Sequence, residues 1–135
     1  MKNKVRALIS FVDLSEIESI ACTNQLDISP TCITRSSILF GGGETISWNF
    51  DVFDSDIADW VLLEENIYKF FRPRRVPIQQ LALRFKGQLL IMIMSSNGIS
   101  SEYLSLSPSC LKILGDLNLS LKVITYSEVN STRQP

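Results

Sequence analysis

Residues 104–126 constrain the fold more than any other part of this chain, because they predict a helix followed directly by a strand. Ser107 can accept hydrogen bonds from the free N–H groups of a first helical turn, and Pro108 suits the first helical position. Apolar residues then recur at helical spacing before a run rich in Leu, Val and Ile. This stretch therefore indicates architecture, and it carries no catalytic motif.

Length and composition predict one domain over residues 1–135, with a flexible tail at 127–135, because 45% of the 135 residues are hydrophobic. The net charge of -1 lacks the basic excess of a general nucleic-acid binder. No run approaches the roughly 20 apolar residues of a membrane span, so we expect no membrane partner. Three scattered cysteines, Cys22, Cys32 and Cys110, predict reduced thiols in a cytoplasmic protein, with Cys32 and Cys110 buried.

The pattern of apolar residues predicts four strands and several helices. The predicted strands are 5–12, 46–52, 88–94 and 119–126, and a further short strand at 102–106 stays open. The run 88–94 is continuously apolar, as expected of a central strand covered on both faces, and Trp48 and Trp60 are expected in the core. The Ser/Thr-rich segment 32–44, with its three glycines, predicts a surface loop.

Helix signals fall between these strands. Asp13 and Glu16 have the spacing of a capping box, which predicts a helix with Ile17, Ile20 and Ala21 facing inward. Residues 56–71 show helical periodicity up to a proline, and a second helical piece follows between Pro77 and Gly87. The order of elements predicts an α+β fold: a four-stranded, mainly antiparallel sheet with helices on one face, ferredoxin-like with an inserted helix pair.

The chain contains no histidine, which makes catalytic triads and zinc-dependent hydrolysis improbable. Gly41–Gly43 lacks the Lys-Ser/Thr pair of a phosphate-binding P-loop, so a flexible loop is the better interpretation. We therefore expect a protein that is not an enzyme and that needs no metal or cofactor.

Charged residues are segregated in the middle of the chain. The acidic sector comprises Asp51, Asp54, Asp56, Asp59, Glu64 and Glu65. The basic sector comprises Lys69, Arg72, Arg74, Arg75, Arg84 and Lys86. Paired acids can catalyse hydrolysis and a basic patch can bind nucleic acid, but caps and solvated helix faces also explain these positions. Two sectors of opposite charge can also steer a protein partner, and this interpretation is preferred.

The chain resembles a family of small bacterial proteins known as domain of unknown function 4279. The resemblance rests on the opening strand and helix at 5–26, the turn Leu26-Asp-Ile-Ser-Pro-Thr31, the strand that carries Trp48, and the finish at 104–126. It implies no catalytic residues. Small families of this kind often act as immunity or antitoxin-like partners, as the resemblance implies for this chain.

These observations together predict a non-enzymatic protein-binding module, an immunity protein that binds and neutralises a cognate bacterial toxin such as a nuclease. The acidic sector would contact the toxin, because it suits a basic protein. The alternative is a small-ligand-binding or regulatory domain.

Overall fold

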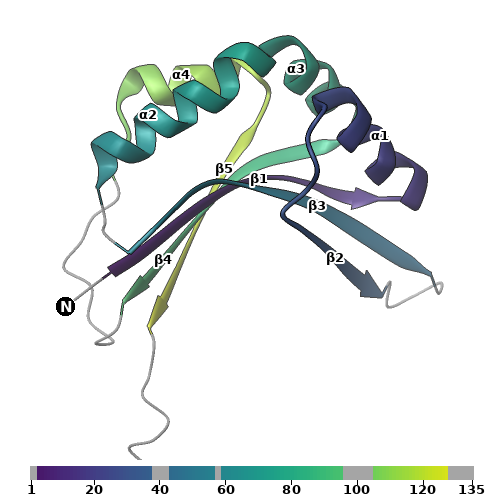
Figure 1. Cartoon of the computed structure of the whole chain (residues 1–135), viewed down its shortest axis with the longest axis horizontal. Helices are drawn as coiled ribbons and strands as arrows, with labels where there is room; N and C mark the ends of the chain where they lie inside the picture. The colour runs from purple at the N-terminus through teal and green to yellow at the C-terminus, as the bar shows by residue number, and fades with distance from the viewer. Residues whose placement is uncertain (1–2, 38–42, 57–58, 96–104, 128–135) are drawn as a thin grey trace, which may run out of the picture.

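The computed structural model describes residues 3–37, 43–56, 59–95 and 105–127. The fold is α+β: a five-stranded mixed, mostly antiparallel sheet carries helices on one face (Figure 1). The strands are β1 (Asn3–Leu14), β2 (Cys32–Ser37), β3 (Glu44–Ser55), β4 (Lys86–Ser95) and β5 (Ser120–Ser127). The helices are α1 (Glu16–Leu26), α2 (Trp60–Phe71), α3 (Arg75–Arg84) and α4 (Pro108–Asp116), with a 3₁₀ turn at Arg72–Arg74 between α2 and α3.

The strand order is β2-β3-β1-β4-β5, with β1 in the centre. β1 pairs antiparallel with both β3 and β4, whereas β5 runs parallel to β4. A parallel pair needs a crossover connection, and the segment that contains α4 supplies it. The expected helices on one face, the helix pair between β3 and β4, and the mainly antiparallel sheet are confirmed.

The expected four-stranded, ferredoxin-like plan is wrong in two respects. The strands on either side of α1, β1 and β3, are antiparallel neighbours, whereas a β-α-β unit would make them parallel. The sheet also has a fifth strand, β2. Cys32–Ser37 was predicted as a loop but pairs antiparallel with β3, from Cys32 opposite Asn49 to Ser37 opposite Glu44. All six residues of β2 are exposed, so the strand carries no alternation of apolar and polar residues that could reveal it. The rest of the predicted loop includes 38–42, which lies outside the described residues.

The core lies between the sheet and the helices. Trp48 is fully buried, and its indole Nε1–H donates a hydrogen bond of 3.0 Å to the Thr23 hydroxyl in α1. Trp60 is half-buried and packs against the same core. Both tryptophans therefore contribute to the core, as predicted. The sheet residues buried under the helices include Val5, Ala7, Ile9, Phe11, Ile46, Trp48, Leu89, Ile91 and Ile93.

Helix α1 begins two residues later than predicted. The capping box is formed by Ser15 and Glu18: the Ser15 hydroxyl accepts from the Glu18 N–H at 3.2 Å, and the Glu18 carboxylate accepts from the Ser15 N–H at 2.8 Å. Ile17 and Ile20 were predicted to face inward but are 79% and 54% exposed. The buried residues of α1 are Ser19, Cys22 and Leu26, which lie on the opposite side of the helix, so the prediction chose the wrong face.

The remaining helices follow the sequence pattern closely. The predicted apolar stripe of α2 is buried at Leu63, Ile67, Phe70 and Phe71. Ser107 caps α4 by accepting a hydrogen bond of 3.2 Å from the Cys110 N–H, and Pro108 is the first helical residue, as predicted.

Gly87 was predicted as a helix stop but lies inside β4, packed closely under two core side chains. A Cβ atom there would lie 2.8 Å from Phe11 Cε1 and 2.7 Å from Leu119 Cδ2. The residue is therefore needed for close packing inside the sheet rather than for ending α3.

Two further expectations concern the ends of the C-terminal half. The open short strand at 102–106 falls mostly on residues outside the described ranges, and Ser105 and Leu106 have no regular structure. β5 confirms the predicted last strand and ends at Ser127, so the predicted tail falls on residues the structure does not describe, apart from Ser127.

Candidate protein-binding site

In the part of the chain that the structure describes, no helix covers the second face of the sheet (Figure 1). Side chains of β4 alternate, so Leu89, Ile91 and Ile93 enter the core while the residues between them face the opposite side. The prediction that β4 is covered on both faces is therefore wrong. Its continuous apolar run places half of its side chains on the uncovered face.

Five apolar side chains on this face form a strip across β4 and β5. The register places Met92 opposite Ile124 and Met94 opposite Tyr126, so these side chains lie next to one another on the same face. We call this group the apolar strip, and its members are Leu90, Met92, Met94, Ile124 and Tyr126. It is a surface that water contacts and that a partner can cover.

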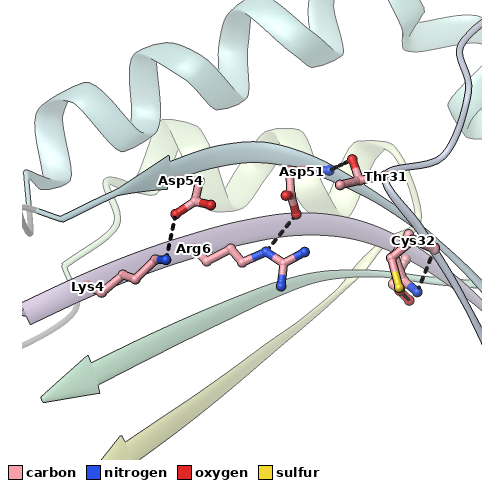
Figure 2. A network of polar contacts seen from close by, with 8 residues as sticks. Lys4, Arg6, Thr31, Cys32, Asp51 and Asp54 are labelled. Carbon is pink, nitrogen blue, oxygen red and sulfur yellow. Dashed lines mark hydrogen bonds and ion pairs between the residues drawn. The ribbon is translucent and has the colours of Figure 1, made fainter.

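A row of paired charges lies beside the apolar strip. Arg6 Nε donates a hydrogen bond of 2.8 Å to Asp51 Oδ1, and Lys4 Nζ lies 3.7 Å from Asp54 Oδ1 (Figure 2). In β1 the register sets Arg6 opposite Met92 of the apolar strip. The hydrogen bond to Asp51 raises the pKa of the Arg6 guanidinium, so Arg6 keeps its positive charge. The charge row therefore consists of two acid–base pairs.

An irregularity in the sheet brings both acids to this face. Residues three apart in a regular strand point to opposite sides of the sheet, yet Asp51 and Asp54 both reach partners on β1. The pairing of β1 with β3 shifts between Ala7 and Leu8, where Ala7 opposes Phe53 and Leu8 opposes Asp51. The extra residue in β3 places Asp54 on the same face as Asp51. Both acids can therefore pair with basic residues of β1 and form the charge row.

Hydrogen-bonded polar side chains of β1 and β3 lie on the same face, next to the apolar Leu8 and Val12 of β1. The Ser10 hydroxyl donates to Asn49 Oδ1 at 2.7 Å, and Asn49 Nδ2 donates to the Cys32 carbonyl at 3.2 Å. The Asp51 N–H donates to the Thr31 hydroxyl at 2.9 Å (Figure 2). A shallow hollow of about 360 Å³ opens above them; its lining includes Arg6, Leu8, Ser10, Asn49, Gln88 and Lys122.

The structure divides the acidic sector among several roles. Asp51 and Asp54 belong to the charge row on the uncovered face. Asp59 caps α2 by accepting a hydrogen bond of 3.0 Å from the Leu62 N–H. Glu64 accepts hydrogen bonds from Ser107 at the start of α4. The two remaining members of the sector, Asp56 and Glu65, are exposed. The six acids are therefore not gathered into one cluster.

Three of the four arginines of the basic sector stack on aromatic rings. The guanidinium carbons of Arg72, Arg74 and Arg84 lie 5.2, 4.5 and 4.8 Å from the ring centroids of Tyr68, Phe70 and Phe85, respectively. Lys86 Nζ lies 3.5 Å from Asp13 Oδ2. Rings already occupied by arginines, with Phe70 buried, are poor platforms for stacking nucleic-acid bases.

The cysteines differ in burial. Cys22 and Cys110 are buried, and burial raises the pKa of each thiol to about 11. Cys32 is exposed on β2, so the prediction that it is buried is wrong; the cause is the unexpected edge strand. Within the described ranges no three Cys, Asp or Glu side chains gather as a metal site requires.

Sequence reasoning missed the apolar strip and the basic half of the charge row. Lys4 and Arg6 alternate with the core residues Val5 and Ala7, and this period of two is a visible signal that they face away from the core. Their pairing with residues of β3 could not be read from the sequence, because it depends on the register and its irregularity.

Comparisons with known proteins find no match: no family model, no curated protein and no solved structure matches the chain. In the part of the chain that the structure describes, none of the helices has the length and apolar character needed to cross a membrane.

Proposed function

We propose that this chain is a non-enzymatic protein-binding module that acts in the cytoplasm as an immunity protein, binding and neutralising a cognate bacterial toxin. One observation supports this most: the uncovered sheet face combines the apolar strip with the charge row. An apolar centre with charged and polar residues beside it is typical of surfaces that bind proteins.

The shape of the face favours a large partner. The apolar strip runs along two neighbouring strands, and the hollow beside it is lined by residues of all five strands, so the polar and apolar groups are spread over a broad area. Small-molecule sites are more often deep and enclose most of the ligand. A protein that lies across the strands can cover the strip and the charge row together.

The charges favour a basic partner. Asp54 and Asp56 are exposed at and just beyond the end of β3, and Glu65 is exposed on α2. Exposed charges around an interface accelerate association with a partner of opposite charge. A toxin that cleaves nucleic acid needs basic residues to bind its polyanionic substrate, which makes a nuclease toxin a suitable class of partner.

Binding to the product of the neighbouring gene, with and without a changed apolar strip, tests this proposal. Met92→Glu places a charge in the strip, and we expect it to abolish both the complex and protection of cells that express the toxin. Val61→Glu is the matched control, because Val61 is an exposed apolar residue on α2, and it should leave both unchanged. Protection that survives Met92→Glu would contradict the proposed face.

The acidic residues require a separate test. We expect Asp56→Lys with Glu65→Lys to slow association with the toxin and to make binding less dependent on salt, because the steering charges are reversed. These two positions are chosen because Asp59 and Glu64 have structural hydrogen bonds. An unchanged association rate would remove Asp56 and Glu65 from the interface.

The hollow favours a second candidate function, a small-ligand-binding or regulatory domain. Arg6, Gln88 and Lys122 line it and could bind an anionic or polar ligand. A ligand that binds only the folded protein raises its melting temperature. Thermal-shift measurements with nucleotides and amino acids test this function, and a shift lost in Lys122→Ala would support it.

A further inference from the structure

We propose that β5 pairs with β5 of a second copy of this chain, antiparallel about a two-fold axis, so that two five-stranded sheets become one continuous sheet. This inference concerns the edge of the sheet and does not depend on toxin binding. It rests on three features of β5: its position, its apolar residues and its self-complementary register.

β5 lies at one end of the strand order and is paired with β4 on one side only. Among the described residues no strand pairs with its other side. An edge strand leaves a row of backbone N–H and C=O groups free to pair with another strand. At eight residues, β5 is longer than β2, the six-residue strand at the other edge.

β5 carries apolar side chains on both faces of the sheet. Leu121 and Val123 lie on the helix side, where the register aligns them with Leu89 and Ile91, yet they are 39% and 41% exposed. Ile124 and its neighbours in the apolar strip face the other side. Apolar residues on both faces are typical of strands inside a sheet, so β5 has the composition of an internal strand at an edge position.

The opposite edge carries the protection that β5 lacks. β2 is short and polar, and its Arg35 forms ion pairs of 2.9 Å with Glu16 and 3.5 Å with Glu44. Short length and charged side chains discourage pairing between sheet edges. In β5 the sole charged residue is Lys122. Of the two edge strands, β5 is therefore the one that we expect to pair with another chain.

A two-fold axis perpendicular to the sheet allows β5 to pair with itself without repulsion. Each residue must then oppose one on the same face of the sheet. If Ile124 opposes Ile124, Lys122 opposes Tyr126, and a cation beside an aromatic ring is favourable. If Val123 opposes its own copy instead, Lys122 opposes Ile124. Neither register sets Lys122 against Lys122, and both cover half-exposed apolar side chains.

Light scattering of the full chain over a series of concentrations provides the first test. We expect the mass to rise from that of a 15.2 kDa monomer to twice that value. Ile124→Lys should abolish the dimer, because it sets two lysines opposite each other in either register. Ile17→Lys makes the same kind of change on exposed α1 and should dimerise normally. Circular dichroism of each variant reports whether it is folded.

Cross-linking gives a second test that does not depend on how well Ile124→Lys folds. In a Cys32→Ser background, Ile124→Cys or Val123→Cys should form a covalent dimer on mild oxidation, since a disulfide needs closely facing residues. Ser36→Cys on β2 is the control and should cross-link much more slowly. A wild-type chain that stays monomeric throughout, or equal cross-linking from β5 and β2, would overturn the proposal.

Discussion

The Glu64 carboxylate accepts two hydrogen bonds of 2.7 Å from Ser107, one from its backbone N–H and one from its hydroxyl. The same hydroxyl accepts from the Cys110 N–H and so caps α4. Glu64 therefore fixes the start of α4 against α2, although the two residues lie far apart in the sequence. An acid that the sequence places in a binding sector has a structural role here.

Glu64→Ala should lower the free energy of unfolding by about 1–3 kcal/mol, because it leaves the half-buried N–H and hydroxyl of Ser107 without their acceptor. Chemical denaturation measures this change. Glu65→Ala removes an exposed acid from the next position and should change the free energy by at most about 0.5 kcal/mol. Equal effects of the two variants would contradict the structural role of Glu64.

Gly87→Ala should destabilise the protein by about 1–3 kcal/mol, because the new methyl group would press on Phe11 and Leu119 in a close-packed core. Gly115→Ala is the matched control: nothing lies within 4 Å of a Cβ atom there, and the residue is helical. Alanine favours helices, so this control should be neutral or stabilising by up to about 1 kcal/mol. Thermal melts of both variants decide whether packing at Gly87 matters.

Cys32 should be the one thiol that reacts rapidly in the native protein at neutral pH. Cys22 and Cys110 are buried, with thiol pKa values raised to about 11, so they are protonated and shielded. Mass spectrometry after brief treatment with iodoacetamide should find one modified cysteine, and three after unfolding. Rapid native modification of Cys22 or Cys110 would show that the core opens readily.

The ion pair of Glu16 with Arg35 should stabilise the protein at neutral pH and fail in acid. The hydrogen bond from Arg35 lowers the pKa of Glu16 below its ordinary value of 4.5. A carboxyl group with a lowered folded pKa contributes stability above 4.5, and the contribution disappears as the pH falls through the folded value. The effect is small, because both side chains are exposed.

Melting temperatures of the wild type and Arg35→Gln across the acidic range measure this contribution. The two curves should be separated at neutral pH and converge in acid. A separation that stays constant with pH would show that Arg35 acts through packing rather than through charge.

Local patterns explain what could be predicted from the sequence. The apolar stripe of α2 and the Ser107-Pro108 start of α4 are short-range signals, and both are confirmed. In α1 the same kind of signal led to the wrong start, because Asp13 resembles a cap but adopts a left-handed conformation at the end of β1, with φ of 59°. The inward face was predicted from Ile17 and Ile20, but the helix packs through Cys22 and Leu26 instead.

Long-range pairing explains what could not be predicted. β2 is a strand because β3 pairs with it, and its own residues show no periodicity. The charge row joins Arg6 to an acid 45 residues away, through a register shift that no local pattern reveals. The acidic sector was chosen because its members are close in sequence, whereas the structure distributes them over a strand, a turn and a helix. Their part in binding remains a prediction.

The central position of β1 determines the order in which the sheet can be completed. β1 precedes every other strand in the chain, but of its two neighbours β3 is made early and β4 only after α2 and α3. Contacts between distant segments slow folding, because a long loop must close before they form. On the ribosome, a nascent chain that ends before Lys86 has three of its five strands, and the edge of β1 that will pair with β4 is still open to chaperones and proteases.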